Sequence, residues 1–165
     1  MSTGHHSVVL NEVQRIVQEE EDSDEILRRV VDLLQERFDH YSWIGIYFVE
    51  GDELQLGPWN GPAATEHVRI PVGQGVCGAA AASGVTEIVD DVDADPRYLA
   101  CFASTRSEIV VPISYEDIVV AEIDIDSDRQ AAFGDADRVF LEDVAALISP
   151  YCLVGWDTGG EPWEP

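Results

Sequence analysis

The stretch from Ser107 to Ser127, "SEIVVPISYEDIVVAEIDIDS", decides the fold. It contains two segments rich in β-branched residues, joined by a short polar connection, which is typical of two strands. In the second segment Ile123 and Ile125 fall on one side of such a strand. Asp124 and Asp126 fall on the opposite side. The sequence therefore predicts a sheet with an apolar face and a group of acids on its other face.

Segments with helical periodicity lie on both sides of the strand-rich region. Apolar residues recur at helical spacing over 9–19 and again over 22–38, where Asp22 and Glu25 are spaced as a capping box. A third helix is expected to begin near Gly134 and to end or kink at Pro150. This order predicts an α+β fold with a mostly antiparallel sheet and helices packed on one face.

The length of 165 residues suits one domain with a sizeable core. We therefore expect a single domain over 1–165. The expected parts are N-terminal helices over 8–39, a sheet core over 41–127, a C-terminal helix over 134–154 and a poorly ordered tail over 155–165.

The charge balance is extreme, with 33 acidic residues against 9 basic ones, no lysine and a net charge of −24. Such a surface would repel nucleic acid and anionic membranes. The acids lie along every segment, which favours a halophile-type surface over a dedicated acidic tail or a cation store. No apolar run is long enough for a membrane span, and no secretion signal is evident, so we expect a cytoplasmic protein.

The chain has three cysteines, which is an odd number and too few for a secreted disulfide framework. Cys77 lies in the glycine-rich "GQGVCG", where the dipole of a helix beginning nearby would favour the thiolate. Cys101 is surrounded by hydroxyl residues and by Arg106, which would also lower a thiol pKa. The alternative for both is a buried, inert cysteine. We expect Cys152 to be part of the core.

Two site types have only weak support. Gly73, Gly75 and Gly78 match the dinucleotide-binding pattern G-x-G-x-x-G, but no parallel βαβ unit follows, so these glycines are expected to shape a loop. His67 with Cys77 and Cys101 would be a scattered zinc set, so no metal site is expected.

Acids and aromatic residues supply a further candidate site. Glu108, at the start of the preceding strand, is placed to join Asp124 and Asp126 in a carboxylate cluster, whose mutual repulsion would keep a proton available near neutrality. A solvated strand face is the alternative in so acidic a chain. Trp43 and Tyr47 share one face of a strand, either as core residues or as the wall of an apolar pocket.

Several of these segments, in this order, resemble the free methionine-(R)-sulfoxide reductases, which are stand-alone GAF-domain enzymes. The similarity runs from about Tyr41 to Ser127 and more loosely through the last helix. The matching words are "WIGIYF", "LGPWNG", "VRIPVGQGVCG", "DV", "LAC", "SEIVVPI" and "DIDS".

The resemblance implies a GAF fold, in which helices flank a central antiparallel sheet of about six strands, and a homodimer. It implies reduction of free methionine sulfoxide without a bound cofactor, with thioredoxin or another dithiol as the electron donor. By position, Cys101 matches the nucleophile, and Cys77 would resolve its sulfenic acid through a disulfide.

The same resemblance assigns the remaining site residues. Glu108, Asp124 and Asp126 match the acids that hold and protonate the sulfoxide oxygen. Trp43 matches an aromatic residue beside the substrate methyl group, and Tyr47 shares its strand face.

The chain departs from the family pattern at several positions. His67 stands where the family usually has a third cysteine, Phe102 replaces an acid, and Arg97 with Tyr98 replaces "GH". These changes keep open the alternative of a non-catalytic GAF module that binds a small ligand or senses redox state. Retention of both cysteines and all three acids favours the enzyme.

Overall fold

The computed structural model describes residues 3–99 and 102–153. Its elements, in chain order, are α1 (Thr3–Glu19), α2 (Ser23–Arg37), β1 (Trp43–Glu50), β2 (Glu53–Asn60), β3 (Arg69–Pro71), α3 (Gly75–Ser83), β4 (Glu87–Val89), the 3-10 turn η1 (Val92–Ala94), β5 (Ser107–Tyr115), β6 (Ile118–Ser127), α4 (Asp135–Ile148) and the 3-10 turn η2 (Ser149–Cys152).

One six-stranded sheet forms the centre of the molecule, in the order β3-β2-β1-β6-β5-β4. Every neighbouring pair of strands is antiparallel. The hairpin of β5 and β6 turns at Glu116 and Asp117, which both adopt a positive φ. The predicted α+β fold with an antiparallel sheet of about six strands is confirmed.

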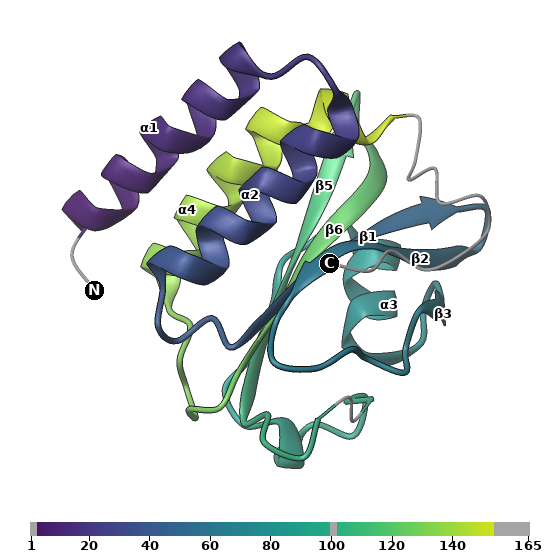
Figure 1. Cartoon of the computed structure of the whole chain (residues 1–165). Helices are drawn as coiled ribbons and strands as arrows, with labels where there is room; N and C mark the ends of the chain where they lie inside the picture. The colour runs from purple at the N-terminus through teal and green to yellow at the C-terminus, as the bar shows by residue number, and fades with distance from the viewer. Residues whose placement is uncertain (1–2, 100–101, 154–165) are drawn as a thin grey trace.

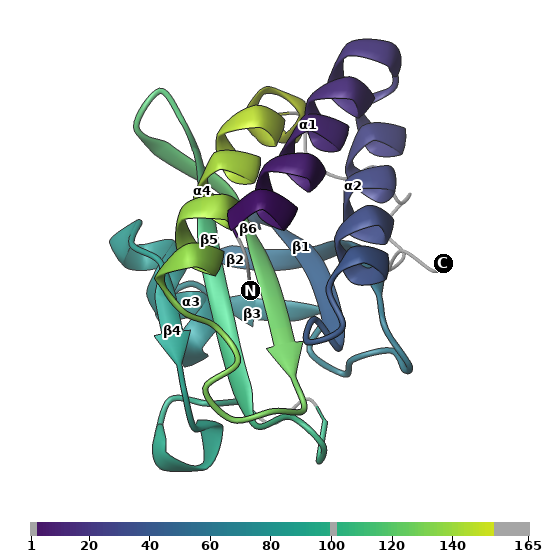
Figure 2. The same ribbon diagram turned by 90° about the vertical axis from the view of Figure 1, so that its left-hand side faces the viewer.

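Three helices, α1, α2 and α4, lie together on one face of the sheet (Figures 1 and 2). The larger apolar core fills this interface, and Ile123 and Ile125 of β6 are buried in it beside Ile44 of β1. Leu141 and Val144 contribute from α4. The two isoleucines lie on the apolar face of the strand, as predicted, and this is the face that packs against the helices.

The opposite face of the sheet is covered by the short helix α3 (Figure 1). A second apolar cluster lies there, with Trp43 and Tyr47 of β1, Trp59 of β2, and Val76 and Cys77 of α3. The acids of β6 are on this side, because side chains alternate between the two faces along a strand.

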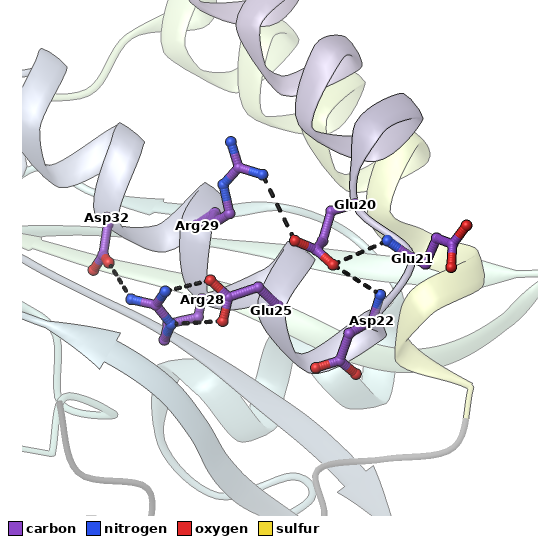
Figure 3. Close-up of polar contacts among 7 residues, drawn as sticks. All are labelled: Glu20, Glu21, Asp22, Glu25, Arg28, Arg29 and Asp32. Carbon is purple, nitrogen blue, oxygen red and sulfur yellow. Dashed lines mark hydrogen bonds and ion pairs between the residues drawn. The ribbon is translucent and has the colours of Figure 1, made fainter.

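The corner between α1 and α2 differs from the predicted capping box (Figure 3). Asp22 is the N-cap residue of α2, but its side chain makes no capping hydrogen bond. The carboxylate of Glu20 accepts the backbone N–H groups of Glu21 and Asp22 instead, at 3.0 and 3.2 Å. Glu25 pairs with Arg28, so it is not available to complete a capping box.

A buried polar cluster connects the sheet to α4. The Asp137 carboxylate accepts a hydrogen bond from the Tyr41 hydroxyl at 2.9 Å, and it lies 3.2 Å from His40 Nε2 and 3.6 Å from His6 Nε2. It also accepts the Gly134 N–H at 3.2 Å, at the start of the helix. Because these contacts come from α1, from the loop between α2 and β1 and from the start of α4, the carboxylate fixes these three segments relative to one another.

The last helix ends near the predicted position, since α4 stops at Ile148 and Pro150 lies in η2. Cys152 is buried in the helical core, and its burial raises the pKa of the thiol to about 12, as expected for a packing residue. None of the helices in the described residues combines the length and the apolarity that a bilayer crossing demands.

The dependence of the fold on the apolar face of β6 can be tested with two isoleucines of that strand. Ile123 is 1% exposed and Ile118 is 67% exposed. Ile123→Ala is expected to lower the free energy of unfolding by about 2–5 kcal/mol, because it leaves a cavity in the core. Ile118→Ala is expected to change it by less than about 0.5 kcal/mol. Urea unfolding of both variants measures the difference, and equal effects would contradict the assigned faces.

Candidate active site

The acidic face of β6 gathers side chains from three adjacent strands. Antiparallel pairing sets opposite residues side by side on the same face. The register between β1, β6 and β5 gives three such rows: Trp43 with Asp126 and Glu108, Gly45 with Asp124 and Val110, and Tyr47 with Glu122 and Pro112.

Cys77 is brought onto this face by the first turn of α3. This first turn requires glycine on both sides of Cys77: at Gly75, where φ is +72°, and at Gly78, where a Cβ would lie 2.7 Å from the carbonyl oxygen of Pro71. A hydrogen bond from the Gly73 N–H to the Gly78 carbonyl, at 2.8 Å, closes the turn. The glycines shape a loop, as predicted, and the antiparallel β4 after α3 excludes a dinucleotide-binding βαβ unit.

A thiol and two carboxyl groups converge at the centre of the site. The Sγ of Cys77 and one carboxylate oxygen each of Glu108 and Asp124 all lie within 4.8 Å of one another. Exposed fractions are 6% for Cys77, 4% for Glu108 and 2% for Asp124. Asp126, also 2% exposed, pairs with Glu108 across β5 and β6. The predicted cluster therefore exists and is buried, which excludes the alternative of a solvated strand face.

The electrostatic state of Cys77 differs from the prediction. The helix dipole was expected to favour the thiolate, but burial raises the pKa of the Cys77 thiol well above its usual range. The charges of Asp124, Glu122 and Glu108 raise this pKa further. Desolvation and nearby carboxylates outweigh the dipole, so Cys77 is a protonated thiol in this conformation.

Burial also raises the pKa of the carboxyl groups around the thiol. It raises the pKa of Asp124, although contacts with Glu108 and Cys77 favour the charged form. The pKa of Asp126 rises because of burial and then because of the charge on Asp124. A carboxyl group whose pKa is raised in this way keeps its proton to higher pH and can donate a hydrogen bond to an incoming oxygen atom; a proton available near neutrality stays a prediction.

Glu122 is a member of this face that we did not predict. It is fully buried, and neither of its carboxyl oxygens has a hydrogen bond of ordinary geometry, although Cys77 is close enough to favour its charged form. Burial and the charge on Asp124 raise its pKa well above the usual range. Its place two residues before Asp124 was the available signal, because residues two apart share a strand face.

The aromatic residues form a buried wall beside the carboxyl groups. Trp43 is 2% exposed and stacks on Trp59 with ring centroids 6.2 Å apart. Its indole Nε1 is buried without a hydrogen-bond partner. The Tyr47 hydroxyl donates a hydrogen bond to the backbone carbonyl of His67 at 2.7 Å. Both predicted aromatic residues are thus in the core on this face, and a contact with substrate remains a prediction.

Cys101, the predicted nucleophile, lies outside the described residues. The described residues next to it reach the site, because Leu99 lines a cavity with Cys77, Glu108 and Asp124, and the Phe102 ring is 6.0 Å from the Trp43 ring. The cavity has a volume of about 10 Å³. That volume is about the room needed for one water molecule.

His67 lies at the edge of the site. It is half-buried in the loop before β3, where a positive charge would favour the ionised form of Asp124. The weak zinc set of His67, Cys77 and Cys101 is untested because Cys101 lies outside the described residues. Among the residues that are described, the structure groups Cys77 with two carboxylates.

Known proteins share both the sequence and the fold. Residues 20–150 match the GAF domain family. The free methionine-R-sulfoxide reductase of Escherichia coli (strain K12) is 40% identical over 116 residues, which cover 70% of this chain and 69% of that protein.

Two solved structures are similar at 38% identity. The X-ray structure of free methionine-R-sulfoxide reductase from Neisseria meningitidis, in complex with its substrate, has a TM-score of 0.83 and covers 89% of this chain and 87% of that chain. The structure of type II free methionine-R-sulfoxide reductase from Thermoplasma acidophilum has a TM-score of 0.77 and covers 82% of this chain and 98% of that chain. The chain therefore belongs to the GAF domain family, in the group of the free methionine-R-sulfoxide reductases.

Proposed function

We propose that this protein reduces free L-methionine-(R)-sulfoxide to L-methionine with cysteine thiols, and that thioredoxin or another dithiol supplies the electrons. The similarity to proteins of that name supports the substrate. The observation that carries the proposal is the buried convergence of Cys77, Glu108 and Asp124 within 4.8 Å. Such a site places a proton donor and a thiol together, which are the two groups that sulfoxide reduction requires.

In the first step Cys101, having released its proton to solvent, attacks the sulfoxide sulfur as a thiolate while a protonated carboxyl group donates its proton to the sulfoxide oxygen. The sulfur–oxygen bond breaks, methionine leaves, and Cys101 carries the oxygen as a sulfenic acid. Methionine sulfoxide is thereby reduced by two electrons and Cys101 is oxidised by two. Asp124 and Asp126 are suited to donate because burial raises the pKa of both carboxyl groups, and Glu108 lies beside Asp126 on the same face.

In the second step Cys77 attacks the sulfenic acid, water leaves, and a disulfide forms between the two cysteines. An external dithiol then reduces that disulfide and becomes oxidised itself. Cys77 is the candidate for this step because it lines the same cavity as Leu99, which precedes Cys101 by two residues. With His67 at the position of the family's usual third cysteine, no other thiol is proposed for this step.

Substrate binding requires the cavity to enlarge. Methionine sulfoxide does not fit in about 10 Å³, and Leu99 is the lining residue next to the proposed nucleophile. Displacement of the Leu99 side chain would open the carboxyl groups to the sulfoxide oxygen. The apolar wall of Trp43 and Tyr47 is then suited to the methyl group of the substrate. A homodimer and a cytoplasmic location remain predictions from the sequence.

The roles of the cysteines can be separated by substitution. Cys101→Ser is expected to abolish sulfoxide-dependent oxidation of dithiothreitol, because the nucleophile is lost. Cys77→Ser is expected to keep one rapid turnover per chain but to slow recycling by thioredoxin about tenfold or more, because no disulfide forms. Cys152→Ser, in the helical core, is the matched control for a lost thiol. Rapid-quench and steady-state assays at low and molar salt measure both steps, and full activity of Cys101→Ser would refute the assignment.

The proton-donor role predicts a specific pH dependence. Wild-type turnover is expected to fall as the pH rises through the raised pKa of the carboxyl cluster, because the donor loses its proton. Asp124→Asn and Glu108→Gln are expected to lower kcat by about 10²–10⁴-fold and to remove this alkaline limb. Asp128→Asn, an exposed acid just beyond β6, should leave both quantities unchanged. An unaltered alkaline limb in Asp124→Asn would assign the proton to another group.

Burial of Glu122 predicts an effect on stability. Because its pKa is raised in the folded state, the folded protein binds more protons than the unfolded chain, and stability falls as the pH rises above the unfolded value of about 4.3. Glu122→Gln should therefore be more stable than wild type at pH 8, with a gap that closes toward pH 4. Urea unfolding across this range measures the gap. The control is Glu66→Gln, at an exposed loop position, and a gap independent of pH would contradict the buried titration.

A further inference from the structure

The cavity beside Cys77 has the size of a single ion or water molecule and an unusual lining. Three of its walls are apolar, from Ile70, Val76 and Leu99. The remaining lining residues are Cys77, Glu108 and Asp124, each of which carries an atom able to bind a metal ion. At about 10 Å³ the cavity holds one small body and excludes a larger ligand.

The three donor atoms are close to the spacing that a metal ion imposes. They lie within 4.8 Å of one another. Two ligands bound to one zinc ion at about 2.0–2.3 Å are at most about 4.5 Å apart, and roughly 3.5 Å apart in a tetrahedral site. Side-chain shifts of roughly 1 Å would therefore bring all three donors onto one ion.

An unsatisfied oxygen points independently to a ligand in this cavity. Although the Asp124 carboxyl group contacts Glu108 and Cys77, its buried Oδ1 has no hydrogen bond of ordinary geometry to any described residue, and Asp124 is 2% exposed. A buried carboxyl oxygen left unpaired costs free energy, which a bound cation would recover. Asp126 Oδ1, next along the same strand face, is also buried and has no hydrogen-bond partner among the described residues. The region around the cavity is therefore poor in hydrogen-bond donors.

The mixture of donors selects the metal. Ca²⁺ and Mg²⁺ prefer sites made only of oxygen, whereas a thiolate together with carboxylates suits Zn²⁺. Three protein ligands leave a fourth tetrahedral position for water, which is the usual form of an open zinc site. Zn²⁺ would displace the protons of the liganding groups into solvent, because metal ligands must be deprotonated. Any ionised carboxylate on this face would then also stabilise the divalent charge; the buried acids there are Glu108, Glu122, Asp124 and Asp126.

We propose that this cavity binds one Zn²⁺ ion through Cys77 Sγ and carboxylate oxygens of Glu108 and Asp124, and that the bound ion inhibits the protein. Coordination would hold the Cys77 sulfur, so that it could not attack a sulfenic acid. It would also occupy the carboxyl groups proposed to protonate the sulfoxide oxygen. The inhibition rests on the proposed function, whereas binding of the ion does not.

Binding is tested on the reduced full-length protein after the small-molecule thiol used as reductant has been removed. Calorimetric titration with Zn²⁺ is expected to give one tight site per chain. Co²⁺, used as a spectroscopic probe of the same site, is expected to show thiolate-to-metal charge-transfer absorption. Absence of a tight site, or a Co²⁺ spectrum without the thiolate band, would overturn the proposal and leave the cavity to a water molecule.

Variants separate this site from weak binding to the acidic surface. Cys77→Ser is expected to remove the thiolate band, and Asp124→Asn to weaken Zn²⁺ binding by more than about tenfold. The matched controls Cys152→Ser and Asp128→Asn should bind as tightly as wild type, because both residues lie outside the cavity lining. Unchanged affinity in both Cys77→Ser and Asp124→Asn would place the ion elsewhere and overturn the proposal.

Inhibition is read from a separate measurement. Stoichiometric Zn²⁺ should stop sulfoxide-dependent turnover of the wild type, and a chelator should restore it. Tight binding without inhibition would overturn the inhibitory part alone. A metal-free wild type without turnover would instead refute the proposed reductase function, while the calorimetric and spectroscopic results would still decide whether the metal site exists.

Discussion

The two-residue periodicity of β6 is the constraint on which the rest of the structure depends. The strand presents Ile123 and Ile125 to the helical core and Glu122, Asp124 and Asp126 to the face under α3. A shift of register by one residue would exchange these faces and bury carboxyl groups among α1, α2 and α4. The same alternation that fixes the fold therefore also fixes the chemical character of the site.

Much of this arrangement could be predicted because alternation is a local property. "EIDID" places acids on one face whatever surrounds it, and the strand before it was readable from its β-branched residues. The meeting of Cys77 with Asp124 was not local. It depends on α3 crossing β5 and β6, which follows from a glycine loop whose geometry is set by close backbone contacts at Gly78.

Glu122 and the Asp22 cap show where sequence reasoning stops: strand alternation gives the face of Glu122 but not its depth. In a chain with 33 acids most carboxylates are solvated, so composition gives no reason to single out Glu122 as buried. Its depth is decided by Cys77 and α3 above it, which are distant in sequence. Asp22 and Glu25 have the spacing of a capping box, but the Glu25 carboxylate accepts a hydrogen bond from Arg28 and the Asp22 N–H donates to Glu20. Both outcomes are set by tertiary partners rather than by propensity.

The raised pKa of Cys77 separates the two cysteines by role. A thiol that is buried and surrounded by carboxyl groups is a poor nucleophile at rest, because the reactive form is the thiolate. Such a thiol is poorly suited to make the first attack on a sulfoxide, and this is consistent with assigning that step to Cys101. It is better suited to the second step, in which a carboxylate that has just given its proton to the sulfoxide oxygen can accept the proton of Cys77. In the proposed mechanism, the cluster that makes Cys77 unreactive in the resting protein is the same cluster that would activate it after methionine has formed.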